Sequence, residues 1–174
     1  MPLINVMFYE PQGGEHWINH VITKYDPPYS HCDVQFEDGM ASSVFQNEKL
    51  YWKERRFRKP GYRRLTVSVD DHTYRKAYSL CSDRFRLGYG FDAIGMYSLP
   101  LSSVFTLDRD KKTFCSKHCA EVLQVAGVRA VKDADPSQLT PSALHRLLES
   151  SKIIHADSSP LAGLRIEVPG ARGL

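Results

Sequence analysis

The chain has no apolar run long enough to cross a membrane. Of its 174 residues, 42% are hydrophobic and 25% are charged, but no stretch approaches the roughly 20 apolar residues that a membrane-spanning helix needs. The opening stretch, MPLINVMFYEPQGGEHW, lacks the basic start and long apolar segment of a secretory signal peptide. Internal repeats and low-complexity tracts are also missing. We therefore expect one soluble domain, without a transmembrane segment, in a cytoplasmic, reducing setting.

Cysteine is scarce, and neither sign of charge dominates. Four cysteines in a reducing setting are more typical of free thiols than of a disulfide framework, and a chain of this length can bury a core without bridges. There are 23 Lys and Arg residues against 20 Asp and Glu residues. The basic residues cluster, with aromatic residues between them, in Lys53 to Arg64, KERRFRKPGYRR. This segment is either a solvated connection or a contact to an anionic surface, and it does not indicate specific nucleic-acid binding.

What the sequence does contain is a succession of strand and helix patterns. In the first half of the chain, the predicted elements are an opening strand in LINVMFYE, a short helix in GGEHWINHVITKYDPP that the two prolines end, a hairpin in SHCDVQFEDGMASSVF with its turn at Asp38 and Gly39, and a strand in RRLTVSVD. The second half is predicted to contain a helix capped by Asp70 or Asp71 that runs to about Leu87, a helix in KTFCSKHCAEVLQVAG that Gly127 ends, and a last helix that Thr140 and Pro141 begin. These patterns predict an α+β domain over residues 1–155, in which a small, mostly antiparallel sheet packs against helices. Residues 156–174 are expected to form a loose C-terminal tail.

The stretch KTFCSKHCAEVLQVAG carries two cysteines and a histidine within five residues. A structural zinc site needs four ligands, and on a helix His118 points away from the face that Cys115 and Cys119 share, so a metal site is not favoured. A disulfide between helical residues four apart has awkward geometry. Cys119 is expected in the core. Cys115, in the first helical turn, is either a partly buried structural residue or a thiol whose pKa the helix terminus lowers.

The stretch SHCDVQFEDG supplies a candidate partner for that thiol. Side chains alternate along a strand, so His31 and Asp33 share a face that we expect to be polar and outward. Cys32 and Val34 share the other, inner face. From this segment alone, His31 is either a base for the thiol or a plain surface residue.

Taken together, these stretches resemble the circularly permuted papain fold of the NlpC-type superfamily, whose permuted branches include YiiX-like amidase or peptidase proteins and lecithin–retinol acyltransferase-like proteins. The stretches that carry the resemblance are WINHVITKYDPPYSHCDVQFEDG, YGFDAIG, TFCSKHCAEVLQVAGV and LTPSALHRLL. They extend from about Val6 to Leu148. The resemblance implies a papain-like α+β fold and a thiol hydrolase that uses neither a metal nor another cofactor.

The resemblance also implies residue roles. Cys115 would be the nucleophile, and His31 the general base that later returns a proton to the leaving group. The position for a third polar residue, on the strand after the hairpin, is occupied by Ser43. Because serine carries no charge, it would orient an imidazolium poorly, and Gln46 or Asp33 could take its place.

Further residues could line the site. The backbone N–H of Cys115 and the hydroxyl of Tyr29 are the candidate donors to a developing oxyanion. Tyr89 and Asp92 are either pocket residues or ordinary packing and turn residues. The leading hypothesis is a cysteine hydrolase that cleaves an amide or peptide bond through an acyl-enzyme. The alternatives are a lipid acyltransferase or thioesterase with the same dyad, and a binding module that has lost its catalytic activity.

Overall fold

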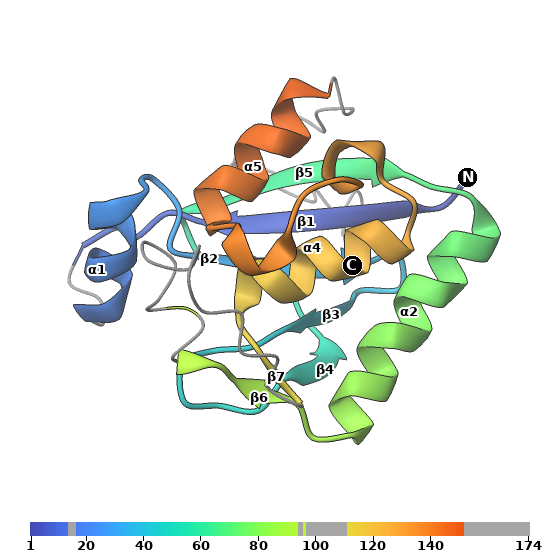
Figure 1. The fold of residues 1–174 in the computed structure, drawn as a ribbon, viewed down its shortest axis with the longest axis horizontal. Coiled ribbons are helices and arrows are strands. Elements are labelled where there is room, and N and C mark those ends of the chain that lie inside the picture. Colours follow the sequence, from blue (N-terminus) through green and yellow to red (C-terminus); the bar gives the residue numbers. More distant parts are fainter. Residues whose placement is uncertain (14–16, 94–95, 97–110, 152–174) are drawn as a thin grey trace, which may run out of the picture.

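A computed structural model describes residues 1–13, 17–93, 96 and 111–151, and these residues form an α+β fold (Figure 1). In this part of the chain, five strands build one antiparallel sheet in the order β4-β3-β2-β1-β5. The strands are β1 (Leu3–Tyr9), β2 (His31–Phe36), β3 (Met40–Ser43), β4 (Tyr51–Glu54) and β5 (Tyr62–Ser68). The predicted fold class, a mostly antiparallel sheet with helices, is therefore confirmed at this level.

The central strands give the sheet two different faces. β1 pairs with both β2 and β5, so that Val6 lies opposite Val34 on one side and Leu65 on the other. The face that carries Val6, Val34 and Cys32 is fully buried and forms the main core. The opposite face carries His31 and Asp33, which are also buried, so the expectation of a polar, outward face is wrong.

The hairpin forms where the sequence predicts it. β2 ends at Phe36 and β3 begins at Met40, with Asp38 and Gly39 between them. Gly39 adopts a φ of 85°, a conformation that residues with a Cβ atom rarely adopt, and its N–H donates to the Phe36 carbonyl at 3.0 Å. The Asp38 carboxylate accepts the N–H of Met40 at 3.0 Å. These bonds fix the register that places His31 at the start of β2.

Four helices in the described residues surround the sheet: α1 (Trp17–Tyr25), α2 (Asp71–Arg86), α4 (Cys115–Val125) and α5 (Pro141–Ser150). Helix α4 packs on β2 and β3, with α2 along one side and α5 toward β5 (Figure 1). The side chains of Cys119, Val122 and Leu123 on α4 are fully buried against the main core. The short connecting elements are η1 (Arg129–Val131), η2 (Pro136–Gln138), β6 (Gly90–Phe91) and β7 (Lys112–Thr113), of which the last two pair in parallel.

The helix ends also agree with the sequence. Asp70 caps α2 by accepting the N–H groups of His72 and Thr73, and Thr140 caps α5 by accepting the N–H of Ala143 at 3.0 Å. Gly127 follows α4 with a φ of 75°, as a C-terminal glycine does. Gly127 therefore accounts for the end of α4 near Val125, whereas no side chain caps its start at Cys115.

The basic segment Lys53 to Arg64 differs from the expectation of a plain connection. Its first residues belong to β4, which pairs with β3 along Met40 to Ser43 and was not predicted, because charged residues interrupt the strand pattern. None of the helices in the described ranges has the length and hydrophobicity that a bilayer span requires. The predicted tail, residues 156–174, lies outside the described residues.

Candidate active site

Cys115 is the first residue of α4 and lies beside the end of β2. The preceding residue, Phe114, is the N-cap in an extended conformation and makes no side-chain hydrogen bond to the helix. The first backbone N–H groups of α4 therefore have no side-chain cap, and they leave partial positive charge beside the Cys115 sulfur. The Cys115 residue is 6% exposed and contributes to the wall of a cavity of about 920 Å³.

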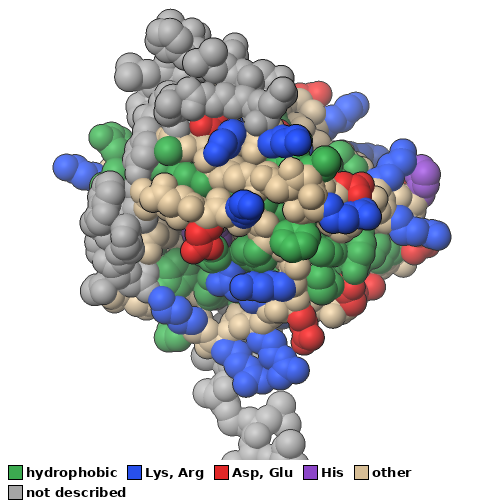
Figure 2. All heavy atoms as spheres, turned by 90° about the horizontal axis from the view of Figure 1, so that it is seen from below, with side chains coloured by type: hydrophobic (Ala, Val, Ile, Leu, Met, Phe, Trp, Pro, Cys, Tyr) green, Lys and Arg blue, Asp and Glu red, His purple; other side chains and the backbone are tan. Residues whose placement is uncertain are grey.

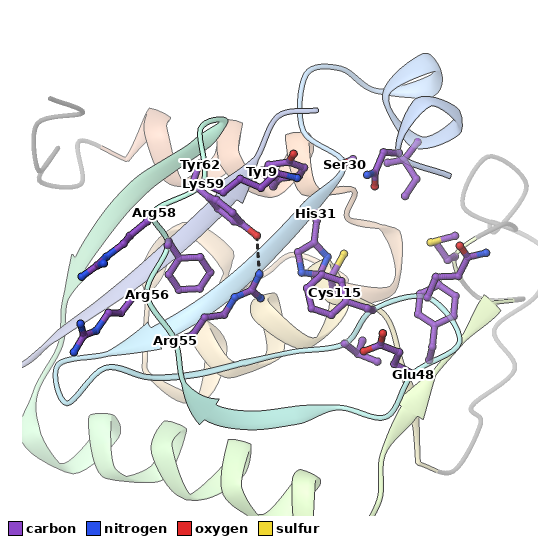
Figure 3. A pocket seen from close by; sticks show the side chains of 18 of the residues that line it. Tyr9, Ser30, His31, Glu48, Arg55, Arg56, Arg58, Lys59, Tyr62 and Cys115 are labelled. Carbon is purple, nitrogen blue, oxygen red and sulfur yellow. Dashed lines mark hydrogen bonds between the residues drawn. The ribbon is translucent and has the colours of Figure 1, made fainter. Parts of the chain in front are cut away.

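His31 lies next to this sulfur, in the wall of the same cavity (Figure 3). The imidazole lies close enough to the Cys115 side chain for each group to shift the pKa of the other, although the two residues are more than eighty positions apart. The ring of Phe45 stacks on the imidazole, with centroids 4.4 Å apart. The structure thus brings together the two residues to which the sequence assigned nucleophile and base.

Asp33 takes the position behind the imidazole. Its Oδ1 lies 3.3 Å from Nε2 of His31, and Asp33 is fully buried. Since Nε2 faces Asp33, Nδ1 is the ring nitrogen left for Cys115. The same Oδ1 accepts hydrogen bonds from Nη1 of Arg55, at 3.0 Å, and from the hydroxyl of Tyr51. Asp33 therefore fixes the ring and supplies a negative charge to an imidazolium.

Arg55 is a component of the site that the sequence did not reveal. Its Nη1 donates to Asp33, and its Nη2 donates to the Tyr62 hydroxyl at 2.9 Å (Figure 3). The guanidinium also lies over four aromatic rings, those of Phe45, Tyr51, Phe57 and Tyr62. The Arg55 guanidinium thus balances the charge of the buried Asp33 carboxylate. At least one basic side chain of the segment Lys53 to Arg64 is therefore part of the site and not of a solvated surface.

The contacts around Cys115 favour its thiolate. A hydrogen bond from the Cys32 thiol lowers the pKa of Cys115; burial opposes this, and the charge and hydrogen bond of His31 lower that pKa further, well below its usual value. Burial alone would lower the pKa of His31, but Asp33 and Cys115 outweigh it and raise the pKa of His31 to about 10. Burial, together with hydrogen bonds to its neighbours, raises the pKa of Cys32, so this thiol stays protonated and donates. The favoured state near neutral pH is a thiolate and imidazolium pair.

The other candidates for the third polar position have different roles. The Ser43 hydroxyl is fully buried and donates to the carbonyl of Cys32 at 2.7 Å, so it is used in fixing the strand that carries His31. Gln46 contributes to the wall of the larger cavity. Of the candidates, Asp33 is the one whose carboxylate contacts the imidazole.

Tyr29 does not supply the donor that was expected of it. Its hydroxyl lies 3.4 Å from Nε2 of His145, and its ring packs on the His145 ring with centroids 4.6 Å apart, in a place that borders neither of the cavities at Cys115. Tyr29 precedes β2, which begins at His31, and the turn of the chain into that strand directs the Tyr29 side chain away from the imidazole. Ser30 borders both cavities instead, and its buried Oγ has no hydrogen-bond partner among the described residues.

Tyr89 and Asp92 also border neither cavity. The ring of Tyr89 lies under the Arg84 guanidinium, 5.3 Å from its centroid. Asp92 is 6% exposed, and its backbone N–H donates to the Thr113 carbonyl at 2.7 Å. These contacts favour the interpretation of both as packing and turn residues, one of the two that their sequence left open.

His118 is separated from Cys115 and has its own partners. Its ring is fully buried between Ser42, whose Oγ is 2.9 Å from Nε2, and Arg84, whose Nη1 is 3.1 Å from Nδ1. Burial and the Arg84 charge lower its pKa to about 3. All four cysteines are free thiols, and no cluster of His, Cys, Asp and Glu in the described residues could hold a metal ion.

A second cavity of about 350 Å³ opens on the other side of Cys115. The two cavities share Ile22, Ser30, Met96 and Cys115, so they meet at the sulfur. His31 borders only the larger one. A ligand could therefore pass the sulfur with one part in each cavity.

Comparisons with known proteins add no relative: the chain matches no family model, no curated protein and no solved structure. The chemistry of the site therefore rests on its own geometry.

Proposed function

We propose that this protein is a cysteine hydrolase that cleaves an amide or peptide bond through an acyl-enzyme formed on Cys115. The observation that carries the proposal is the position of His31 beside Cys115 at the start of α4, next to two cavities that a substrate can enter (Figure 3). A thiolate at neutral pH is the reactive form of cysteine, and its formation here needs no metal or cofactor.

In the acylation step, the Cys115 thiolate attacks the carbonyl carbon of the substrate. The negative charge that develops on the carbonyl oxygen is stabilised by the backbone N–H of Cys115, at the positive end of α4. The carbon–nitrogen bond then breaks, and the His31 imidazolium gives its proton to the leaving amine. The products of this step are a free amine, a thioester on Cys115 and a neutral imidazole.

In the deacylation step, neutral His31 accepts a proton from water, and the resulting hydroxide attacks the thioester. The carbon–sulfur bond breaks, the acid is released and the thiolate and imidazolium pair is restored. Asp33 stabilises the imidazolium in both steps, and Arg55 keeps the buried carboxylate neutralised. These two residues position His31, and Arg55 also contributes to the wall of the larger cavity.

We also propose the circularly permuted papain-like fold of the NlpC-type superfamily. The supporting features are the chain order, with the histidine strand and its hairpin before the cysteine helix, and the packing of α4 across the sheet beside β2. The proposed setting is cytoplasmic, where reduced thiols persist. A binding module without catalytic activity would be favoured if the third polar residue were the uncharged Ser43. The Asp33 carboxylate, which lies beside His31, argues against that alternative.

A lipid acyltransferase or thioesterase is the second candidate. The apolar cavity of about 350 Å³ beside Cys115 favours it, since an acyl chain needs an apolar site. Peptide and phospholipid substrates offered side by side, with and without anionic vesicles, separate the two candidates.

The nucleophile is tested with Cys115→Ala and a thiol-directed acyl analogue. We expect loss of both turnover and labelling in this variant. Cys81→Ala is a matched control, because Cys81 is equally buried but packs against His118 rather than His31. Labelling that persists in Cys115→Ala, or that is lost in the control alone, would refute the assignment of the nucleophile.

A further inference from the structure

The two cavities that meet at Cys115 differ in chemical character. The smaller one is mostly apolar, with Val21, Ile22, Met96 and Phe114 in its wall. Among the described residues, the wall of the larger one contains four Lys or Arg side chains besides His31, and one acidic side chain; these are Arg55, Arg56, Arg58, Lys59 and Glu48. A substrate that passes the sulfur would meet an apolar environment on one side and a basic environment on the other.

The position of His31 decides which half of the substrate occupies which cavity. During acylation, the leaving amine must receive its proton from the imidazolium. His31 borders the larger cavity and not the smaller one. The leaving half therefore extends into the larger, basic cavity, and the acyl half, which stays on Cys115 as the thioester, lies in the smaller, apolar cavity.

Not every basic residue of the larger cavity is available to a ligand. Arg55 is paired with Asp33 and enclosed by aromatic rings. Arg56 and Arg58 are exposed and extend outward at the end of the cavity away from Cys115 (Figure 3). Arg56 has a distant partner, Glu54, at 3.9 Å. Glu48 lies on the opposite side of Cys115 from Arg56 and Arg58 (Figure 3). The basic character is thus concentrated some distance from the sulfur.

One face of the molecule carries a mixed distribution of charge. On the face in Figure 2, Lys and Arg side chains alternate with acidic and hydrophobic ones. A mixed surface of this kind does not favour a large polyanion, whereas a few cations at one end of a cavity favour a short segment with carboxylates.

We propose that the substrate is a peptide with an apolar residue on the acyl side of the cleaved bond and acidic residues on the amine side. This inference rests on the proposed hydrolase and adds the substrate class and its direction. The size of the apolar cavity, about 350 Å³, is at the low end of ligand pockets and suits one apolar side chain better than a long acyl chain. The distance of Arg56 and Arg58 from Cys115 favours acidic residues beyond the first position after the cleaved bond.

The experiment uses four blocked peptides of equal length. The acyl-side residue is leucine or asparagine, which are similar in size, and the amine half carries two glutamates or two lysines. We expect the highest kcat/KM for the leucine and glutamate peptide. Exchange of leucine for asparagine should cost about 10- to 100-fold, and exchange of glutamate for lysine about tenfold or more, less at high salt. Mass spectrometry of the products identifies the cleaved bond.

Variants then assign each preference to its cavity. Arg56→Glu combined with Arg58→Glu should remove or invert the preference for glutamate and leave the preference for leucine. Val21→Asn, in the apolar cavity alone, should do the opposite. Arg75→Glu combined with Lys76→Glu, on the exposed side of α2, makes the same change in net charge away from both cavities and should alter neither preference.

Failure of this inference can be distinguished from failure of the hydrolase itself. Iodoacetamide labels a reactive Cys115 whatever the substrate is, so labelling at pH 6 tests the thiolate separately. With labelling present, equal turnover of the four peptides, a preference for lysine, or cleavage of phospholipid vesicles but of no peptide overturns the substrate assignment and leaves the nucleophile. Absence of labelling overturns both.

Discussion

Replacement of Asp33 by asparagine removes the charge behind the imidazole while it preserves the shape of the side chain. Asp33 Oδ1 lies 3.3 Å from Nε2 of His31, a distance at which two unit charges attract by about 5 kcal/mol at an effective dielectric constant of about 20. Because 1.36 kcal/mol corresponds to one pH unit, loss of that attraction should lower the pKa of His31 by roughly three units or more. The positive charge of Arg55, which is left without its partner, lowers the pKa of His31 further.

The consequence is measurable at Cys115. In the native protein, the pKa of His31 is raised to about 10 and that of Cys115 is lowered well below its usual value, so the thiolate is present throughout the neutral range. We expect the rate of Cys115 alkylation by iodoacetamide to change by less than about twofold between pH 6 and pH 8. In Asp33→Asn the imidazolium is no longer favoured, and the rate should rise with pH over the same interval by up to roughly 50- to 100-fold, the limit for a thiol with the free pKa of about 8.5.

Asp38→Asn is the matched control. Asp38 lies in the turn that β2 enters, accepts hydrogen bonds from Met40 and Tyr78, and is exposed. Its loss removes one charge from the same hairpin without contact with His31, so the alkylation profile should stay flat. NMR titration of the His31 ring provides an independent reading. A flat profile in folded Asp33→Asn, together with a His31 pKa still at about 10, would refute the role assigned to this carboxylate.

The remaining predictions concern the supports of the site. Cys32→Ala removes the thiol donor to Cys115 and should shift the alkylation profile of Cys115 to higher pH. Cys81→Ala removes a side chain of equal size from the core and should not shift that profile. Equal shifts in the two variants would exclude a specific role for Cys32. Arg55→Leu leaves the Asp33 carboxylate buried without its cation and should lower the free energy of unfolding, measured in urea, by about 3 kcal/mol. Arg56→Leu, at an exposed position, should lower it by less than about 0.5 kcal/mol. Similar unfolding midpoints for the two variants would contradict this prediction. Leu123→Ala creates a cavity beneath α4 and should cost about 2–5 kcal/mol, compared with a small effect for Val125→Ala, whose side chain is 38% exposed.

Local patterns were sufficient to predict most of the described elements. The glycine at position 39, the cap Thr140 and Pro141 at the start of α5 each act within a few residues of themselves, and each was assigned correctly. The cap of α2 is Asp70, one of the two residues that the sequence offered. β4 was missed because its four residues include a lysine and a glutamate, and its pairing with β3 depends on a neighbour that the local sequence does not reveal.

The site was harder to predict than the fold, since its contacts join distant segments. The sequence singled out Cys115 and His31, and it offered Asp33 among three alternatives for the position behind the ring. It did not reveal Arg55, because a long side chain in a basic run resembles a solvated one until the strands bring it over the carboxylate. The Tyr29 hydroxyl was assigned by proximity along the chain, and the turn into β2 directs it to His145 instead.

The order of residues on β2 has a consequence for how the protein loses its reactive thiolate on unfolding. His31, Cys32 and Asp33 alternate between the two sheet faces, and their pairing with Tyr9, Phe8 and Met7 on β1 holds that alternation in place. A slip by a single residue would send Cys32 among the aromatic rings and turn the imidazole away from the sulfur. We therefore expect no half-melted species with a working nucleophile: in rising urea, iodoacetamide reactivity at pH 6 should vanish at the same midpoint as the circular dichroism of the sheet.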